Sequence, residues 1–406
     1  MSPAQPSASI PEILAAQRLE HVRYAIRDIA VAAEQLARQG KEILPLNIGD
    51  PLQFDFRTPR HLIEAVTKAM WDGEDGYAPS LGMPDALEAI RSEAGRKGIR
   101  NIRSVFVTQG VTEAVDLALT ALVNPGEDVL TPCPEYPLYS AVLAKLDARP
   151  NSYALSEAQG WEPDLEDLAR KVTDKTRAIV VINPNNPTGA VYSRRTLEAI
   201  ADLARRHGLL LIADEIYDKL ILDGEAHLSI AALAPDVPAI TFNGLSKAYL
   251  VPGWRVGWGI ASGPEPALKP YLDGVHKLLR ARLSANRPEQ YAIRPALEGS
   301  QEHLTEVVAK LRARRNLTAN WCNSNPGISC VPPQGAFYAF PRLEVTEDDE
   351  QFVRRLLQEK HVLVVHGSGF GRPEGIGHFR IVFLPQEDTL RRAYQGIGEF
   401  MEKHYA

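Results

Sequence analysis

The chain has 406 residues, of which 45% are hydrophobic and 24% charged, and its net charge is −6. This length exceeds one small core and predicts two domains, or one large α/β domain with a lesser partner. The acidic balance, without any basic run, argues against nucleic acid or an anionic membrane as a partner. The three cysteines show no metal-ligand spacing, so we expect reduced thiols and no metal.

The start of the chain predicts neither export nor membrane insertion. Its first residues, "MSPAQPSASIPE", lack the basic and apolar regions of a signal peptide. No apolar run approaches the roughly 20 residues that a membrane span needs. We therefore expect a soluble, cytoplasmic protein.

Helices and one short strand are predicted in the N-terminal quarter. A helical pattern covers residues 15–40 and ends at Gly40. The segment "ILPLNIGDP" predicts a short strand followed by a turn. Two more helices are predicted over residues 58–73 and 82–98, because each segment has a proline near its start and a glycine at its end.

From about residue 104, apolar strands alternate with helices. The predicted strands lie in "SVFVTQG", "EDVLTPCPEY", "RAIVVINPNNPTG", "HGLLLIADEIY" and "AITFNGLSK". Continuous apolar strands in this rhythm are typical of a parallel sheet that is buried on both faces.

After about residue 295 the rhythm is lost, and helices mix with short strands as in a small α+β domain. We therefore predict an α/β fold with two domains and an N-terminal segment. The large domain, residues 50–295, would contain a mostly parallel, doubly wound sheet. The smaller α+β domain would comprise residues 296–406, with the N-terminal segment 1–49 packed against it.

Three polar residues follow predicted strands at a regular spacing. Asn186 lies 28 residues before Asp214, and Asp214 lies 33 residues before Lys247. Each interval is about one βαβ unit. The three side chains should therefore meet outside the carboxyl ends of the strands, where open α/β sheets bind their ligands.

Lys247 stands in an apolar and aromatic segment, "TFNGLSKAYLVPGWRVGW". A surface lysine with an extended side chain is the ordinary interpretation of such a residue. However, an amine buried by these neighbours would have a lowered pKa and would become a nucleophile for a carbonyl group. The segment therefore suggests a Schiff base.

Pyridoxal phosphate is a carbonyl cofactor that fits the neighbouring residues. Asp214, at the end of "LLLIAD", would oppose the pyridine nitrogen. Tyr217 and Asn186 would donate to the phenolate oxygen, and Tyr136 in "PCPEYPLY" would stack on the ring. Taken alone, "NPNNPTG" equally predicts a tight turn, and Tyr136 in a proline-rich loop predicts only ordinary packing.

An anion site is predicted in "TQGVTEAV". Gly110 would let the strand turn into a helix, so that the backbone N–H groups of Val111 and Thr112 and the Thr112 hydroxyl would face a phosphate. Arg255 would add a forked, charged contact to the same phosphate. A strand–glycine–helix turn alone is weak evidence for an anion site, because many α/β proteins have such a turn with nothing bound.

Over nearly its whole length the sequence resembles the fold-type I pyridoxal-phosphate aminotransferases, the aspartate aminotransferase superfamily. The motifs that carry the resemblance are "LNIGDP", "GYAPSLGMPDALEAI", "VTQGVTEAV", "PCPEYPLY", "NPNNPTG", "ADEIYDKL", "GLSKAYLVPGWRVGW", "PQGAFYAFP" and "HFRIVFLP". Each motif is modest, but their joint order and spacing are specific.

The resemblance implies roles that the spacing alone does not give. Lys247 would carry the cofactor as an internal aldimine. Arg380, in "HFRI", would hold the substrate α-carboxylate with help from the backbone near Gly49. Tyr77 would reach the cofactor phosphate of the other subunit, since such enzymes are homodimers with active sites at the interface. Without the resemblance, Arg380 would predict only a surface ion pair.

Two positions depart from the commoner family pattern. Gly244 stands where many members have serine, so either one phosphate hydroxyl is missing or Ser246 replaces it. His366 stands where proline is more usual, and we interpret it as structural.

Within the superfamily, the sequence is most similar to bacterial alanine (glutamate–pyruvate) aminotransferases. In these enzymes the N-terminal segment folds over the site, so Tyr24 and Arg27 of "YAIR" would close on the substrate, with Arg27 meeting the distal carboxylate of glutamate. An arginine on the surface of an amphipathic helix is an equally good interpretation of Arg27.

The expected reaction moves an amino group between an amino acid and a 2-oxo acid by a ping-pong mechanism, with alanine and 2-oxoglutarate giving pyruvate and glutamate. Branched-chain, methionine and aromatic donors remain open. The same key residues would also serve a C–S β-lyase. A non-catalytic pyridoxal-phosphate sensor would need a basic DNA-binding region that is not seen here. A cofactor-free α/β protein is the remaining alternative.

Overall fold

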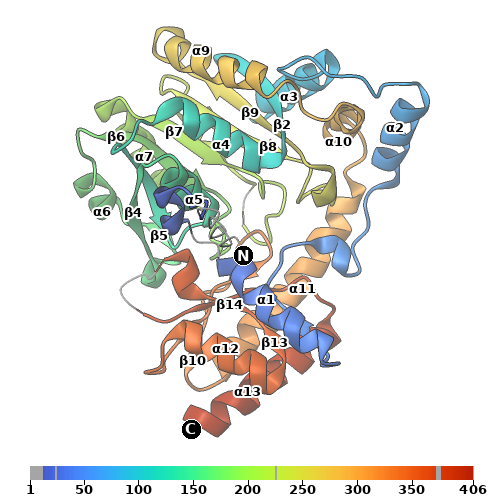
Figure 1. Ribbon diagram of the computed structural model, residues 1–406, viewed down its shortest axis with the longest axis vertical. Helices are drawn as coiled ribbons and strands as arrows, with labels where there is room; N and C mark the ends of the chain where they lie inside the picture. Colours follow the sequence, from blue (N-terminus) through green and yellow to red (C-terminus); the bar gives the residue numbers. More distant parts are fainter. Residues whose placement is uncertain (1–11, 23–24, 225, 372–375, 406) are drawn as a thin grey trace, which may run out of the picture.

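The computed structural model describes residues 12–22, 25–224, 226–371 and 376–405. An eight-stranded sheet forms the core of its larger part, which is the upper part in Figure 1. The strand order is β2-β9-β8-β7-β6-β3-β4-β5. The five strands from β8 to β4 run parallel, whereas β2, β9 and β5 pair antiparallel with their neighbours. The strands are β2 (Ile102–Gln109), β3 (Asp128–Cys133), β4 (Arg149–Ser156), β5 (Glu162–Pro163), β6 (Thr176–Ile182), β7 (Leu210–Asp214), β8 (Ala239–Gly244) and β9 (Val256–Ser262).

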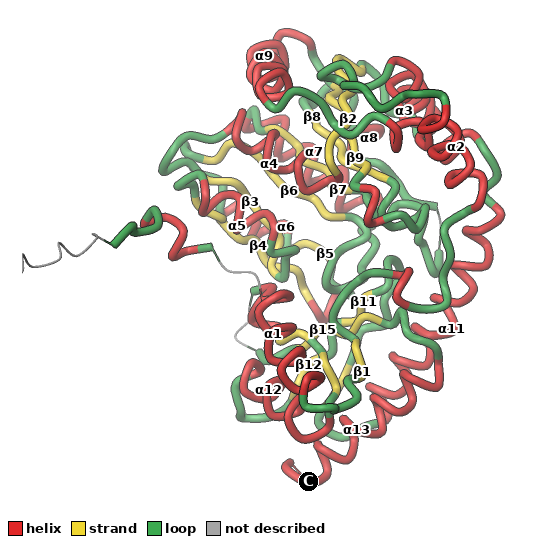
Figure 2. Tube along the Cα trace, turned by 45° about the vertical axis from the view of Figure 1, so that its right-hand side comes forward, coloured by secondary structure: helices red, strands yellow, loops and turns green. Residues whose placement is uncertain are grey.

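Both faces of this sheet are buried, as the apolar strands predict. Successive side chains of a strand point to opposite faces. On β6, Val180 and Ile182 therefore pack with the apolar residues of α4, α5 and α9, and Ile179 and Val181 pack with those of α3 and α7. In Figure 2 the yellow strands run between these red helices. The helices are α3 (Pro84–Arg96), α4 (Gly110–Leu122), α5 (Leu138–Lys145), α7 (Arg194–His207) and α9 (Glu265–Ala281).

Smaller sheets and three long helices form the C-terminal part. A three-stranded sheet has the order β11-β15-β14 and is antiparallel throughout. The elements are α11 (Glu302–Ser324), β10 (Ile328–Ser329), β11 (Tyr338–Ala339), β12 (Arg342–Leu343), α12 (Asp349–Lys360), β13 (Val362–Leu363), β14 (Val365–His366), β15 (Phe379–Val382) and α13 (Glu387–Tyr405).

The N-terminal segment joins this C-terminal part. Strand β1 (Leu44–Pro45) pairs in parallel with β13, and the blue helix α1 (Ala25–Arg38) lies beside the orange and red elements in Figure 1. The other helical segments are η1 (Gln17–His21), η2 (Pro51–Gln53), α2 (Arg60–Trp71), η3 (Glu157–Gln159), α6 (Leu165–Arg170), α8 (Ile230–Leu233), η4 (Pro252–Trp254), η5 (Pro288–Ala292), α10 (Ile293–Glu298) and η6 (Gly367–Phe370).

The predicted single helix over residues 15–40 is wrong in its first half. The structure has a short 3₁₀ turn, η1, followed by Val22 in an extended conformation, and α1 begins only at Ala25. Residues 12–22 are all exposed, so little burial stabilises a longer helix there. The helices predicted over 58–73 and 82–98 are confirmed as α2 and α3. Within the described ranges, no helix is long and apolar enough to cross a membrane.

Candidate active site

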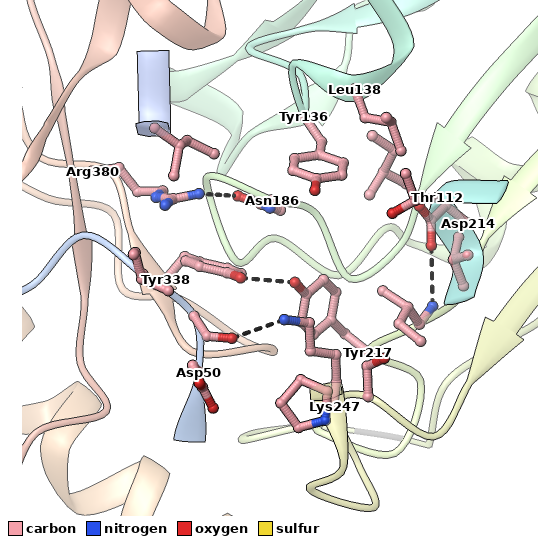
Figure 3. A pocket seen from close by; sticks show the side chains of 18 of the residues that line it. Asp50, Thr112, Tyr136, Leu138, Asn186, Asp214, Tyr217, Lys247, Tyr338 and Arg380 are labelled. Carbon is pink, nitrogen blue, oxygen red and sulfur yellow. Dashed lines mark hydrogen bonds between the residues drawn. The ribbon is translucent and has the colours of Figure 1, made fainter. Parts of the chain in front are cut away.

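A cavity of about 570 Å³ opens at the carboxyl ends of β6, β7 and β8. Asn186 follows β6, Asp214 ends β7 and Lys247 follows β8, so the neighbouring parallel strands bring these three side chains together as predicted. Figure 3 shows the cavity from close by. The other predicted site residues that line it are Gly49, Val111, Thr112, Tyr136, Tyr217, Ser246, Arg255 and Arg380.

Lys247 points into the cavity toward the N-terminal segment. Its Nζ donates a hydrogen bond to the carbonyl oxygen of Gly49 at 2.8 Å (Figure 3). The same nitrogen lies 5.5 Å from the ring centre of Phe337. Burial lowers the pKa of Lys247 to about 8, an effect that the charge of Asp50 opposes and that of Arg380 supports. A substantial fraction of this amine is therefore neutral, and nucleophilic, near physiological pH.

Asp214 is an acidic residue that lines the cavity. It is buried, and its carboxylate accepts hydrogen bonds from the Tyr139 hydroxyl at 3.1 Å and from the backbone N–H of Ile216 at 3.3 Å. Burial raises the pKa of Asp214 to about 6. Both of these donors are neutral, so a cationic N–H group in the cavity would stabilise the ionised carboxylate.

Tyr217 lies beside Lys247 and contacts a second phenol. Its hydroxyl is 2.8 Å from that of Tyr338, and the two rings meet edge to face. Burial, with Tyr338 as a further cause, raises the pKa of Tyr217 well above its usual range. Tyr217 is therefore a neutral hydroxyl that can donate one proton.

A positively charged corner is built where α4 begins. Val111 and Thr112 stand in the first turn of α4, and Nη2 of Arg255 lies 3.4 Å from Oγ1 of Thr112. Two glycines allow this close packing. A Cβ atom on Gly110 would collide with the Arg255 guanidinium, and one on Gly257 would lie 2.5 Å from the backbone N of Val111. Helix N–H groups, a hydroxyl and a guanidinium together suit a phosphate.

Arg380 supplies a second, separate cation on the opposite side of the cavity. It is buried on β15, and its guanidinium donates to Oδ1 of Asn186 at 3.0 Å and to the carbonyl oxygen of Asn47 at 2.6 Å. The rings of Tyr338 and Phe370 lie on it, each with its centre 4.7 Å away. A guanidinium held in one orientation beside a cavity suits a carboxylate.

Comparison with known proteins shows the family to which the chain belongs. A family model described as "Aminotransferase class I and II" matches residues 41–397. The chain belongs to this family. The aminotransferase is 41% identical to glutamate-pyruvate aminotransferase AlaA of Haemophilus influenzae, over 95% of this chain and 98% of the relative. It is 42% identical to an alanine aminotransferase of Mycobacterium bovis, over 95% of this chain and 91% of the relative.

A solved structure agrees with these relatives. The alanine aminotransferase of Pyrococcus furiosus superposes on the chain with a TM-score of 0.93 and 42% sequence identity, covering 96% of this chain and all of that one. The expected α/β fold, with its large and mostly parallel sheet, is thereby confirmed.

Gly244 and His366 are the two residues that depart from the family pattern. Ser246 lines the cavity, whereas a Cβ atom on Gly244 would lie 2.6 Å from the carbonyl oxygen of Val256 in the adjacent strand. His366 bonds through Nδ1 to the Ser368 hydroxyl at 2.8 Å, and that hydroxyl donates to Asp349 at 2.6 Å. These contacts support a structural interpretation of His366.

Three predicted site residues are not placed in the cavity. Tyr77 is 78% exposed on the loop between α2 and α3. Arg27 belongs to α1, but the side chain of Arg27 is not described. The preceding residue of the helix, Ile26, lines the cavity. Tyr24 lies outside the described residues.

Sequence reasoning missed several side chains of the aminotransferase site. Tyr139 contacts Asp214 from within the quoted motif "PCPEYPLY", and Tyr338 contacts Tyr217 from within "PQGAFYAFP". Each motif as a whole indicates the family, but no spacing rule indicates these two positions. Asp50, which also lines the cavity, follows directly after the predicted Gly49.

Proposed function

We propose that this aminotransferase binds pyridoxal 5′-phosphate in the cavity and transfers an amino group between alanine and 2-oxoglutarate, giving pyruvate and glutamate. The observation that carries the proposal is Lys247, a buried amine whose pKa is lowered to about 8 and which shares one cavity with a buried acid, a phenol and two guanidinium groups. Family membership and the names of the relatives support the same reaction.

The residues around the cavity fit the groups of this cofactor. Asp214 would hold the proton of the pyridine nitrogen, because a buried carboxylate with neutral donors is stabilised by a cation. Tyr217 would donate to the phenolate oxygen. Asn186 would donate there through its Nδ2, since its Oδ1 already accepts from Arg380. Tyr136 would stack on the ring. The phosphate would be held by Val111, Thr112, Ser246 and Arg255.

The bound cofactor would supply an aldehyde for the Lys247 amine and an electron-poor ring that withdraws electrons from the substrate Cα. Arg380 would orient the substrate through its α-carboxylate, with help from the backbone of Gly49. The freed Lys247 would accept the Cα proton, for which its lowered pKa is suited. Ping-pong kinetics would follow.

Alanine as the amino donor rests on the relatives and on the lining of the cavity. Ile26 and Ile48 line it together with Arg380. A small apolar side chain would pack against such residues, as that of alanine does. We further propose that Tyr24 and Arg27 close over the substrate and that Arg27 pairs with the distal carboxylate when glutamate is bound.

We also propose that the chain works as a homodimer in the cytoplasm. The exposure of Tyr77 supports this idea, because a side chain that reaches a neighbouring subunit must leave its own. The division into an N-terminal segment 1–49, a large domain 50–295 and a small domain 296–406 belongs to the same proposal, and the pairing of β1 with β13 supports it.

A panel of amino donors tests the reaction. Each donor is mixed with the cofactor-loaded protein, and the half-reaction is followed through the cofactor spectrum, with pyruvate and 2-oxoglutarate as acceptors. We expect alanine with 2-oxoglutarate, and glutamate with pyruvate, to react fastest. Borohydride reduction and peptide mapping should place the cofactor on Lys247. Pyruvate and ammonia formed from cystathionine without any acceptor would instead indicate a C–S lyase.

A further inference from the structure

Tyr338 contacts both functional halves of the cavity. It lies on β11, its hydroxyl is 2.8 Å from that of Tyr217, and its ring centre is 4.7 Å from the Arg380 guanidinium (Figure 3). Tyr217 stands on the cofactor side of the proposed site, and Arg380 on the substrate side. One side chain therefore connects the two groups.

The surroundings hold Tyr338 in one place. The residue is 3% exposed, and the Tyr217 and Phe337 rings pack against it. On its other side, a Cβ atom on Gly49 would collide with the Tyr338 hydroxyl. The carbonyl oxygen of Gly49 is also the acceptor for Lys247. The Tyr338 hydroxyl therefore occupies space that is free only because residue 49 has no side chain.

The number of protons on the two phenols limits the direction of the hydrogen bond between them. Each neutral tyrosine hydroxyl has a single proton to donate. Burial raises the pKa of Tyr217 well above its usual range, so Tyr217 keeps its proton near neutral pH. If Tyr217 donates that proton to a cofactor oxygen, the bond between the phenols must be donated by Tyr338. A hydroxyl that accepts one hydrogen bond donates a stronger one.

We propose that Tyr338 is a positioning residue with two separable parts: its hydroxyl donates to Tyr217 and directs the Tyr217 proton toward the cofactor, and its ring holds Arg380 for the substrate carboxylate. This inference rests on the proposed cofactor site.

The hydroxyl can be tested through the colour of the cofactor. A hydrogen bond to an anionic oxygen favours the deprotonated form of the group that contains it. Tyr338→Phe weakens the Tyr217 donation and should therefore raise the apparent pKa of the Lys247-bound cofactor by roughly half a pH unit or more. Cofactor affinity, measured by equilibrium dialysis, should fall severalfold.

Tyr153→Phe is the matched control. Tyr153 is also fully buried, but its hydroxyl donates to the carbonyl oxygen of Val180 at 2.8 Å, away from the cavity. This variant should leave the titration of the cofactor unchanged. In a Tyr217→Phe background, adding Tyr338→Phe should shift nothing further, because the effect passes through Tyr217.

The ring is tested on the substrate side. Tyr338→Phe keeps the aromatic face and should leave the KM for alanine within about twofold, whereas Tyr338→Leu and Phe370→Leu remove one face of the sandwich around Arg380 and should raise that KM. Phe370→Leu should not move the cofactor titration. This separation of the two readouts is not expected from a merely structural role.

The experiments distinguish a failure of the proposed function from a failure of the role proposed for Tyr338. A wild-type protein that forms no reducible bond with pyridoxal phosphate overturns the proposed function and this inference together. A wild-type protein that does form it, with Tyr338→Phe titrating like Tyr153→Phe, overturns only the inference. A shift that persists in the Tyr217→Phe background also overturns it.

Discussion

The guanidinium of Arg380 donates to Oδ1 of Asn186 at 3.0 Å, and this bond joins the C-terminal three-stranded sheet to the loop that follows β6 of the central sheet. The proposed substrate-binding and cofactor-binding groups therefore touch directly.

Arg380→Lys should raise the KM for alanine by roughly 10- to 100-fold, because an ammonium cannot reproduce the forked contact to a carboxylate. Steady-state kinetics with alanine as the varied substrate and 2-oxoglutarate as the acceptor measures this KM. Arg342→Lys is the control, since Arg342 is partly exposed and forms an ion pair with Glu157 at 3.8 Å. An equal effect of the two variants would contradict the assignment of the carboxylate to Arg380.

Lys247→Met should remove a pH dependence of stability from the cofactor-free protein. The unfolded lysine keeps its proton up to its ordinary pKa of 10.5, whereas the folded one loses it near 8. Between these values the unfolded state binds more protons, so the folded state gains stability as pH rises, by on the order of 3 kcal/mol. Urea unfolding of both proteins from pH 7 to 10.5 should show this gain only in the wild type.

Asp214→Asn should make the cofactor-free protein more stable at pH 7 while it lowers turnover. Burial raises the pKa of this carboxyl from 3.8 to about 6, so the folded state binds more protons between these values and loses stability as pH rises through them. The variant avoids a cost on the order of 3 kcal/mol above pH 6. The two proteins should be equally stable below about pH 4, and turnover should fall by at least ~100-fold.

Gly257→Ala should weaken cofactor binding at least ~10-fold, because the added methyl group would lie 2.5 Å from the backbone of α4 at Gly110 and Val111. Equilibrium dialysis against pyridoxal phosphate measures the loss. Gly95→Ala, in the helix α3 with nothing within 4 Å of the new atom, should bind normally and be about 0.5–1 kcal/mol more stable. If Gly257→Ala binds as tightly as Gly95→Ala, the phosphate does not lie at this corner.

Tyr77→Ala and Lys247→Ala proteins should each be inactive or weak alone, yet regain activity when mixed and refolded together. In a mixed dimer with sites at the interface, one site receives both defects and the other receives neither. Mixing without refolding, which leaves the parent dimers intact, is the control. A mixture that never exceeds its components would contradict the proposed role of Tyr77.

The repeated strand and helix units made the centre of the site predictable. Asn186, Asp214 and Lys247 each follow a strand of the parallel sheet, so their spacing was enough to place them at one edge. Arg380 has no such spacing, because its strand lies in the irregular C-terminal part, and only the family resemblance indicated its role.

Other features depend on contacts that no local pattern reveals. Tyr338 meets Tyr217 across 121 residues, and Tyr139 meets Asp214 across 75 residues. The late start of α1 has a different cause, since the residues before it are exposed and lack the burial that would stabilise a longer helix.

The hydrogen bond from Arg380 to the carbonyl oxygen of Asn47 spans 333 residues of chain. A ribosome must therefore release nearly the whole polypeptide before this wall of the cavity can close, although Lys247 and Asp214 have emerged long before. The complete cavity can therefore form only at the end of synthesis.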